Sequence, residues 1–403
     1  MPRVISVLHH PEASLEPGRI AEEENNGWHF RSAKALVKYS GYITVAVRPG
    51  SSSEWISKSI DGVLTIVVPS IDLPPSKKFR GRIAISPVLA RVVRDFVERL
   101  DFIPYVHEYR ALNSELVARA LIDHPMFFQH HGSRPPGGLR LGNPIGSVKE
   151  LNRLRREAFL RKVRGVFFVL TRYEEYYLRN ILGVDAEVRI RTMCVDFDEI
   201  KPLSPVEKLV AKRSLGLRGD EILITTYMGV FGEEFSSLKG AHYIPRIWRA
   251  LRNKFGDRIR MVVTGVGEPY ATVLRRTGII AYKRLPHRDF IKVVGASDIY
   301  FLPATSGYRY GGISVAVMEA MALGIPIISP TLMEFPERER IRDIGIATKW
   351  VDDEFSLSRF IDDLVYLIEN KDSYRPWVIR ELGMKYYSWQ VFARDFREAL
   401  SKL

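Results

Sequence analysis

The sequence contains a single cysteine, Cys194, among its 403 residues, so no disulfide can form within the chain and a reducing compartment is expected. Long apolar runs are also lacking: no stretch approaches the ~18–20 residues that a membrane-spanning helix needs. The opening apolar run, 4–8, is too short for a signal peptide and is typical of a first β-strand. We therefore expect a cytoplasmic protein, with peripheral attachment to the inner face of a membrane as an alternative.

Composition excludes a disordered or collagen-like chain, because 46% of the residues are hydrophobic and 27% are charged, enough for a large core. The formal net charge of +13 favours phosphate-bearing partners. Residues 131–172 concentrate this charge, with ten Lys or Arg against two Glu. Within this range, the segment 149–165 has apolar residues near helical spacing. This pattern fits either a helix that lies on an anionic membrane or an ordinary helix with a solvated face. Nucleic acid is not expected, since no aromatic platform accompanies the charge.

Short apolar runs alternate with helical patterns in two sets, separated by the polar stretch 196–220. This rhythm predicts an α/β protein with two doubly wound, Rossmann-like domains, each built on a parallel sheet. We place a linker near 200–215 and the two domains at 1–205 and 206–385. The predicted strands are 4–8, 42–47, 63–68, 103–106, 126–128, 166–170, 222–228, 259–263, 279–282, 299–302 and 325–328. The predicted helices are 29–39, 87–100, 114–122, 241–254, 288–296, 314–323, 356–369, 373–387 and 389–402.

The most informative segment is 308–328, which follows a predicted strand. Its two glycines, Gly311 and Gly312, let the backbone approach a ligand and precede a helix that starts near Ser314. A helix N-terminus offers free N–H groups and suits phosphate or sugar oxygens. Glu319, about one and a half turns into this helix, could accept hydrogen bonds from a ribose diol. The same pattern also fits a glycine-hinged helix with a surface glutamate.

Residues 312–328 closely resemble the signature of the retaining, GT-B-fold glycosyltransferases of group 1 (family 4-like), which include sucrose, glycogen and mannosyl transferases. Weaker matches follow in the family's order over nearly the whole chain. They are the strand ends 105–108, 127–132 and 261–267, the segments 166–172 and 190–196, and the pair Ser388-Trp389 before the last helix. The resemblance implies two Rossmann-like domains facing a cleft, with the C-terminal helix, 386–403, packing back on the N-terminal domain.

The resemblance also implies a nucleotide diphosphate sugar as donor, held mostly by the C-terminal domain. Glu319 would bind the donor ribose, and backbone N–H groups of 312–314 would meet the sugar and the diphosphate. The first of the family's two glutamates falls at Gly311, which departs from the pattern, while Arg309 would supply a cation or be a solvated loop residue. The predicted donor-binding residues are Gly27, Gly229, Lys239, Gly265, Arg309, Gly311, Gly312, Ile313, Ser314 and Glu319.

Two residues match catalytic positions of the family. Lys239 matches a lysine that neutralises the charge on the leaving diphosphate, whereas the family's arginine position holds Val230 or Glu233. His131 matches the N-domain histidine that faces the reacting sugar. The alternative for the His130–His131 pair is one packed and one solvated histidine at a strand end. No third ligand follows at metal-binding spacing, so no metal site is expected there. The resemblance implies a reaction with no metal and no other cofactor.

The resemblance, together with these residues, implies a metal-independent, retaining hexosyl-type glycosyltransferase. It would move a sugar from a nucleotide diphosphate sugar to a hydroxyl of a lipid-linked or other glycan acceptor, which would dock near 130–147. The expected partners are the donor, this acceptor and an anionic membrane surface met by 149–165. The alternatives are a catalytically silent sugar-nucleotide-binding subunit and another chemistry of this fold, such as sugar-nucleotide epimerisation.

Overall fold

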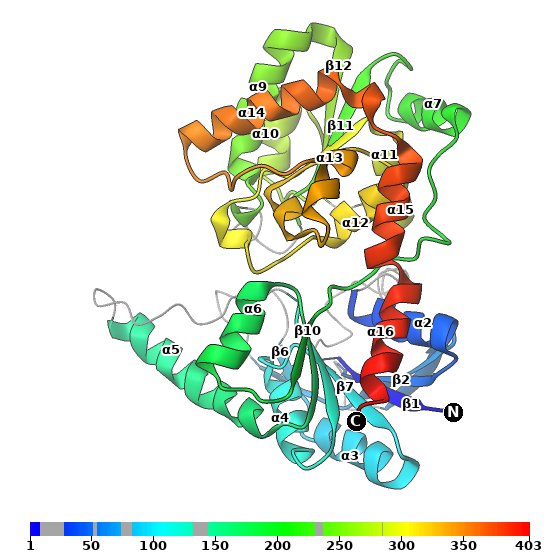
Figure 1. The fold of residues 1–403 in the computed structure, drawn as a ribbon, viewed down its shortest axis with the longest axis vertical. Coiled ribbons are helices and arrows are strands. Elements are labelled where there is room, and N and C mark those ends of the chain that lie inside the picture. Colours follow the sequence, from blue (N-terminus) through cyan, green and yellow to red (C-terminus); the bar gives the residue numbers. More distant parts are fainter. Residues whose placement is uncertain (9–27, 51–54, 74–82, 132–143, 230–236, 284) are drawn as a thin grey trace. The chain divides into compact units, whose positions relative to one another are not determined.

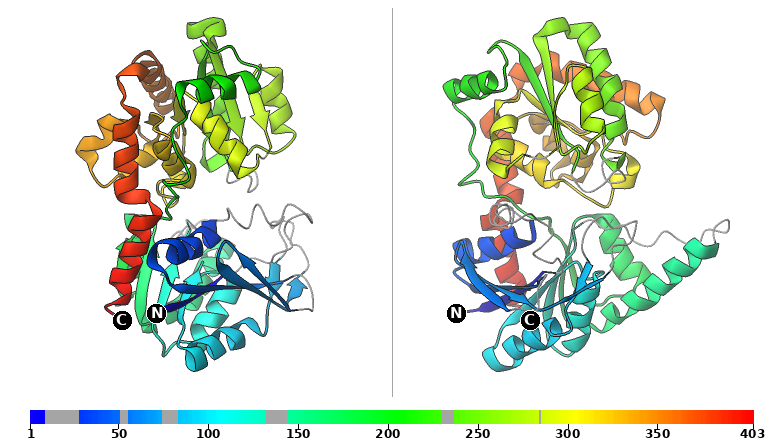
Figure 2. Two further views of the ribbon diagram at one scale, coloured as in Figure 1. Left: turned by 90° about the vertical axis from the view of Figure 1, so that its right-hand side faces the viewer. Right: turned by 180° about the vertical axis from the view of Figure 1, so that it is seen from behind.

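The computed structural model describes residues 1–8, 28–50, 55–73, 83–131, 144–229, 237–283 and 285–403. The chain forms two compact units, an N-terminal unit of residues 1–193 and 392–403 and a C-terminal unit of residues 194–391 (Figure 1). Each unit is built on a largely parallel sheet with helices on both faces (Figure 2), which confirms the predicted α/β class. The units divide between 193 and 194, and most of the last helix belongs to the N-terminal unit.

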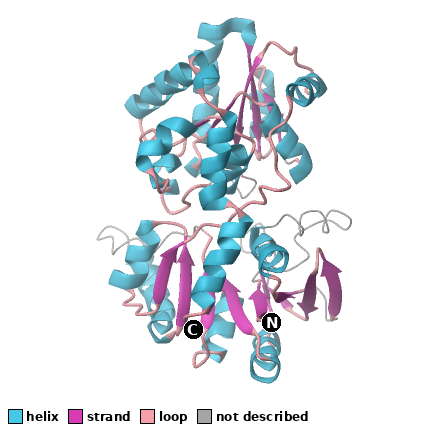
Figure 3. Ribbon diagram, turned by 45° about the vertical axis from the view of Figure 1, so that its right-hand side comes forward, coloured by secondary structure: helices cyan, strands magenta, loops and turns pink. Residues whose placement is uncertain are grey.

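The N-terminal sheet, whose strands are magenta in Figure 3, has the strand order β10-β9-β8-β7-β1-β2-β4-β3. All of its strands run parallel except β3, which pairs antiparallel with β4. The strands are β1 (Arg3–Val7), β2 (Ile43–Pro49), β3 (Ile56–Ile60), β4 (Val63–Val68), β7 (Ile103–His107), β8 (Met126–Gln129), β9 (Gly165–Val169) and β10 (Glu187–Ile190), with β5 (Ile71–Leu73) and β6 (Ile83–Ile85) forming a separate antiparallel pair. The helices are α2 (Trp28–Ser40), α3 (Leu89–Leu100), α4 (Leu112–Ala120), α5 (Pro144–Glu157), η2 (Ala158–Lys162), α6 (Arg172–Tyr176), η3 (Tyr177–Ile181) and α16 (Trp389–Leu400).

Aromatic side chains fix α16 against one face of this sheet. Phe396 stacks on Phe127 with ring centroids 4.1 Å apart and contacts the edges of Tyr105 and Phe168. Successive residues of a strand point to opposite faces, so the neighbouring ring Phe128 lies on the other face. The paired aromatic residues of β8 and β9 therefore supply apolar surface to both sides of the sheet, as expected of a buried parallel sheet.

The C-terminal sheet has the order β13-β12-β11-β14-β15-β16, and all of its strands are parallel. Its strands are β11 (Ile222–Tyr227), β12 (Ile259–Thr264), β13 (Ile280–Tyr282), β14 (Ile299–Phe301), β15 (Ile327–Ile328) and β16 (Gly345–Ile346). The α-helices are α7 (Pro205–Ser214), α9 (Ile244–Phe255), α10 (Tyr270–Arg276), α11 (His287–Ala296), α12 (Val315–Ala322), α13 (Ile341–Ile344), α14 (Glu354–Glu369) and α15 (Pro376–Tyr387). The 3-10 turns are η4 (Ala241–Tyr243), η5 (Gly256–Arg258), η6 (Ser306–Tyr308), η7 (Pro330–Glu334), η8 (Arg338–Arg340) and η9 (Lys371–Ser373).

The polar stretch that we interpreted as a linker near 200–215 contains helix α7, so that interpretation was wrong. Ser204 and Glu207 form a reciprocal capping box at its start. Lys208 and Lys212 both reach the Asp298 carboxylate at 2.8 Å and so attach the helix to the C-terminal unit. Burial alone would raise the pKa of Asp298, but these two ammonium groups outweigh it and hold that pKa below its ordinary value. Among the described residues, no helix has both the length and the apolar character that crossing a membrane requires.

Candidate functional site

The strand order of the C-terminal sheet reverses between β11 and β14, which lie side by side although two strands separate them in the chain. In open parallel sheets the crevice at such a reversal, beyond the carboxyl ends of the strands, is where ligands bind. Lys239 lies in the connection that leaves β11, and residues 308–314 lie in the connection that leaves β14. The topology therefore brings the two predicted donor-binding segments to one place.

Residues 308–314 form a turn that ends as the start of α12. Gly312 has a φ of +57°, a conformation that side chains rarely adopt. The hydroxyl of Ser314 accepts a hydrogen bond from the Val317 N–H at 3.3 Å and so caps the helix. The predicted helix start is confirmed, and the turn carries backbone N–H groups at the positive end of a helix dipole.

Lys239 is buried, with only 3% of its surface exposed. Its Nζ donates to the Tyr227 carbonyl oxygen at 3.4 Å and lies 4.6 Å and 5.7 Å from the ring centres of Tyr227 and Tyr308. Both rings present electron-rich faces to the cation. Burial lowers the pKa of Lys239 to about 7, because a charged ammonium is poorly solvated there. With this pKa, the Lys239 amine is only partly protonated near neutral pH, and an anion bound beside it would favour the charged form.

Hydrogen bonds tie the Lys239 segment to the segment after β14. The N–H and the hydroxyl of Thr305 both donate to the Leu238 carbonyl oxygen, at 2.9 and 3.1 Å. Gly240 lies so close to Pro303 that an added Cβ would be 1.9 Å from the Pro303 carbonyl oxygen. The position of Lys239 relative to Tyr308 therefore depends on contacts between residues more than sixty positions apart.

Gly311, the position of the missing glutamate, packs against the ring of Tyr308. A Cβ at 311 would lie 2.7 Å from the Cζ atom of that ring, closer than real carbon contacts allow. The Tyr308 ring is itself buried, with 6% of its surface exposed. The space that a side chain at 311 would need is thus filled by an aromatic ring that also borders Lys239.

Gly229 and Gly265 close the site on the side of β12. Both have positive φ angles, +86° and +74°. A Cβ at Gly265 would lie 2.8 Å from the Gly229 nitrogen and 2.7 Å from the Tyr227 ring. These two glycines let the chains that leave β11 and β12 approach each other beside the ring that covers Lys239.

Glu319 is 2% exposed, and its Oε1 lies 2.7 Å from Nε2 of His287 at the start of α11. The expected surface glutamate of the alternative interpretation is therefore not found. His287 was not among the predicted site residues, although its place directly after Pro286 and before the predicted helix 288–296, beyond a strand end, was a usable signal. The His287 imidazole orients the Glu319 carboxylate and so holds it in position to accept hydrogen bonds from a diol.

Other predicted donor residues lie elsewhere or act through the backbone. Arg309 is exposed, with its guanidinium over the Tyr310 ring at 5.1 Å. The Ile313 side chain belongs to the hydrophobic core, which leaves its backbone as the group that could meet a ligand. Gly27 lies outside the described residues, as do Val230 and Glu233.

His131 belongs to the N-terminal unit and follows β8. Its Nε2 lies 2.9 Å from Nδ1 of His107, and its neighbour His130 contacts the carboxylates of Glu108 and Glu174 at 2.7 and 3.5 Å. Burial acts to lower the pKa of His130, but the two carboxylates outweigh it and the pKa is raised. Both histidines are buried, so the alternative of one packed and one solvated histidine is wrong.

The sequence Asp196-Phe197-Asp198 has the Asp-x-Asp order found at some metal sites. Here Asp196 Oδ1 accepts from the Asp198 N–H at 2.9 Å, and Asp198 Oδ2 accepts from Gln390 Nε2 at 2.9 Å. Both carboxylates thus stabilise the turn at the beginning of the C-terminal unit. Within the described part of the chain, no group of three or more His, Cys, Asp or Glu side chains is arranged to hold a metal ion.

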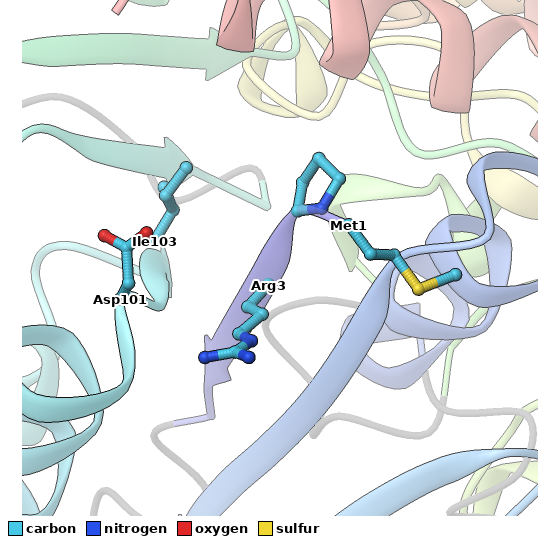
Figure 4. A pocket seen from close by; sticks show the side chains of 5 residues that line it. Met1, Arg3, Asp101 and Ile103 are labelled. Carbon is cyan, nitrogen blue, oxygen red and sulfur yellow. The ribbon is translucent and has the colours of Figure 1, made fainter.

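A pocket of 340 Å³ lies at the opposite, amino-terminal ends of β1 and β7 (Figure 4). It is lined by Met1, Pro2, Arg3, Asp101 and Ile103. Parallel sheets bind ligands beyond the carboxyl ends of their strands. This pocket is therefore not part of the candidate site.

Comparison with known proteins finds a family match over the region that contains the candidate site. The family described as glycosyl transferases, group 1, matches residues 224–370. A curated relative from Corynebacterium glutamicum, a GDP-mannose-dependent monoacylated alpha-(1-6)-phosphatidylinositol monomannoside mannosyltransferase, is 25% identical over 190 residues, which cover 44% of this chain and 48% of the relative. The chain thus spans about half the length of that relative.

Solved structures match over the full length. Sucrose-phosphate synthase from Thermosynechococcus elongatus superposes with a TM-score of 0.69 at 13% identity, covering 100% of this chain and 99% of that one. The HepE protein of Anabaena, in complex with UDP, superposes with a TM-score of 0.66 at 15% identity and covers 100% of both chains. At such identities these likenesses show a shared fold.

The contact between Gly311 and Tyr308 can be tested by substitution. Gly311→Ala should lower the free energy of unfolding of the full chain by about 1–3 kcal/mol, because the new methyl group would overlap a buried ring. Tyr308→Ala should remove most of that extra cost, giving a coupling of about 0.5–3 kcal/mol in a double-mutant cycle measured by urea denaturation.

Gly267→Ala is the matched control, since a Cβ at 267 meets nothing within 4 Å. It should leave stability nearly unchanged. Equal costs for Gly311→Ala with and without the Tyr308 ring would show that the ring does not occupy the space beside 311.

Proposed function

We propose that the protein is a glycosyltransferase. Residues 224–370 belong to the group 1 glycosyl transferases, and the whole chain has the GT-B fold. It would transfer a sugar from a nucleotide diphosphate sugar to a hydroxyl group, with retention of configuration and without a metal ion. The acceptor we propose is a glycan, either lipid-linked or free. The curated mannosyltransferase supports this acceptor, since its name includes a phosphatidylinositol mannoside, and the HepE structure with UDP supports a nucleotide donor.

The observation that carries the proposal is the convergence of a buried lysine and a capped helix N-terminus at one strand reversal. Lys239 and the 308–314 turn share the Tyr308 ring, and Glu319 lies one and a half turns further into α12. Two positive groups suit a diphosphate, and a carboxylate beyond them suits the two hydroxyls of a ribose. A nucleotide diphosphate has this order of groups.

In the reaction that we propose, the bond between the anomeric carbon and the diphosphate oxygen breaks and a bond to the acceptor oxygen forms on the same face. The acceptor's hydroxyl proton passes to the departing phosphate oxygen, so protons balance without a separate base. Lys239 and the N–H groups at the start of α12 would stabilise the negative charge that grows on the diphosphate. These groups would take the role that a metal ion has in other transferases.

The alternative of a silent sugar-nucleotide-binding subunit is favoured by one observation, the Tyr308 ring packed against Gly311. A glutamate there would have offered hydrogen bonds to the donor sugar. With the ring in place, this part of the site presents an aromatic edge and the Tyr308 hydroxyl instead. The reaction itself must therefore be measured, and nucleotide binding alone does not decide between the two functions.

The deciding experiment incubates the full-length protein with a panel of nucleotide diphosphate sugars and glycan or lipid-linked acceptors. Acceptor-dependent release of nucleoside diphosphate, together with a glycosylated product in which NMR finds the donor's anomeric configuration, supports the proposal. Binding of a nucleotide sugar without release would establish the silent subunit. Conversion of the donor without any acceptor would establish epimerisation or another reaction of this fold.

Lys239 gives the donor site a pH dependence of known sign. A diphosphate beside Nζ favours the charged amine and raises the pKa of Lys239 from its ligand-free value of about 7. Binding above that pH must therefore take up a proton, and affinity should fall toward about tenfold per pH unit between roughly pH 7 and 9. Calorimetry of nucleoside diphosphate binding in buffers of different ionisation enthalpy measures both effects.

Lys239→Met keeps the length of the side chain and removes the titrating group. Binding by this variant should be weak and should no longer take up a proton over the same pH range. Lys254→Met, at an exposed lysine that pairs with Glu369, serves as the control and should behave as the unmodified protein. Affinity that stays constant with pH in the unmodified protein would contradict the role of Lys239.

We also propose that α5 binds an anionic membrane surface from the cytoplasmic side. The single cysteine, which is free and buried, fits a reducing compartment of this kind. The helix extends away from the sheet of the N-terminal unit (Figure 2) and exposes 57% of Val148 and 50% of Leu151. Arg153 pairs with Glu157 and Arg156 with Glu115, which reduces the charge left for lipid. Apolar contact must therefore contribute alongside charge.

The protein should sediment with phosphatidylglycerol-containing vesicles at low salt and be released at high salt. Leu151→Glu should weaken the sedimentation, because it places a charge where an apolar side chain would enter the lipid. Phosphatidylcholine vesicles provide the control. Failure to sediment at low salt would leave α5 as an ordinary solvated helix.

A further inference from the structure

Three side chains of the N-terminal unit form a hydrogen-bonded row at the reversal of its own strand order, between β1 and β7. Ser6 Oγ of β1 lies 3.0 Å from Nε2 of His107, the last residue of β7. Nδ1 of His107 lies 2.9 Å from Nε2 of His131. Ser6 and His107 are fully buried, and His131 is 7% exposed. Both ring nitrogens of His107 are thus used within the protein.

The two imidazoles meet at their nitrogen-bearing edges. Their planes differ by only 11°, and their centroids lie 5.2 Å apart, far more than the 2.9 Å between the bonded nitrogens. Tyr105 packs against the His107 ring, with centroids 4.3 Å apart. The geometry suits a hydrogen bond along a ring lone pair, and it fixes which nitrogen of His131 is engaged.

A neutral imidazole has one N–H and one lone pair, so the row can be aligned in only two ways. In the first, Ser6 donates to His107, His107 donates from Nδ1 to His131, and His131 carries its proton on Nδ1. In the second, each donor and acceptor is exchanged, and His131 has a lone pair on Nδ1. The alignment therefore decides whether the outer nitrogen of His131 donates or accepts.

Ser6 selects the first alignment. Among the described residues, the hydrogen bond to His107 is the one that its hydroxyl makes. If Ser6 accepted there, its own O–H would be buried without an acceptor, and an unsatisfied buried donor is costly. If Ser6 donates, the O–H is satisfied. The row then runs from Ser6 through His107 to His131.

The carboxylates nearby do not interrupt this row. Glu108 and Glu174 are engaged with His130, and Tyr109 donates to Glu174 at 3.0 Å. The His130 ring packs on Tyr109, which contacts Phe128 and Phe167, whereas His107 packs on Tyr105, which contacts Phe396. His130 and His107 thus belong to networks on opposite faces of the sheet, and the two carboxylates lie in the network of His130.

We propose that His107 is a positioning residue which, together with Ser6, holds His131 as the neutral tautomer with its proton on Nδ1. His131 would then donate a hydrogen bond to an oxygen of the transferred sugar, and it would not serve as a base at that nitrogen. The sugar as the recipient of the bond depends on the proposed function. The tautomer of His131 does not, since it follows from the contacts of Ser6 and His107.

The tautomer can be read without any assay of activity. Nitrogen-15 NMR of the full-length protein with labelled histidine distinguishes the two neutral tautomers and the charged ring, with His131→Gln identifying the His131 signals. His131 should be neutral and protonated on Nδ1, while His130 should be charged. A proton on Nε2 of His131 overturns the proposal.

Ser6→Ala tests the source of the alignment. Without the hydroxyl, His107 can turn its proton either way, so the His131 signals should shift toward a mixture of tautomers. Ser6→Thr retains the hydroxyl and should restore the unmodified spectrum. Thr65→Val, which removes another buried hydroxyl of the same sheet, is the control and should leave the spectrum unchanged. An unchanged His131 tautomer in Ser6→Ala also overturns the proposal.

Once transfer is measured, Ser6→Ala should lower kcat by roughly tenfold with little change in the KM for the donor, because the fold and the donor site are intact while His131 is misaligned. Ser6→Thr should recover most of the loss. Equal activity of Ser6→Ala and the unmodified protein would remove the tautomer from the reaction. Absence of transfer by the unmodified protein would contradict the proposed function. The NMR result would then still test the tautomer of His131.

Discussion

Burial of a positive charge is the constraint on which the C-terminal site depends. The Lys239 ammonium lies between two tyrosine rings, where water solvates it poorly, and its pKa falls to about 7 as a result. A protein gains nothing in stability from holding an amine in this way. The arrangement becomes favourable when an anion arrives, because attraction between opposite charges is strong where water is excluded. The glycines around Lys239 and the capped start of α12 leave backbone groups free to complete the same anion site.

The two units use the same topological device for different chemistry. Each sheet reverses its strand order once, between β1 and β7 in one unit and between β11 and β14 in the other. At the first reversal the neighbouring strands bring Ser6 and His107 together, and at the second they bring Lys239 and the 308–314 turn together. The first place holds a neutral, proton-ordered row, and the second holds positive charge. A polar transition state needs both a counter-charge for the leaving group and oriented donors for the sugar.

Much of the fold could be predicted because it depends on local pattern. Each of the eleven predicted strands overlaps a strand of the two sheets, and α12 starts and ends close to the predicted bounds 314–323, but β3, β10 and β16 were not predicted. Helix α7 was missed because its polar composition was given more weight than its capping residues, Ser204 and Glu207. The partners of the site residues could not be predicted, because the Tyr308 ring beside Gly311 and the His287 imidazole beside Glu319 arise where segments distant in sequence meet. A substitution of glutamate by glycine is visible in the sequence, but the ring that fills its place is a property of the folded chain.

The central claim is that the segment from Lys239 to Glu319 binds the nucleotide diphosphate part of a sugar donor. Glu319 tests it best, because its carboxylate is buried and oriented by His287 rather than exposed. The most direct measurement is calorimetric titration of nucleoside diphosphates into the unmodified protein, Glu319→Ala and, as a control, Glu369→Ala at an exposed glutamate of the same unit. We expect that one or more nucleoside diphosphates bind, that Glu319→Ala weakens this binding by about 1–3 kcal/mol, and that Glu369→Ala has no effect. Unchanged affinity in Glu319→Ala, or no binding of any nucleoside diphosphate to the unmodified protein, would contradict it.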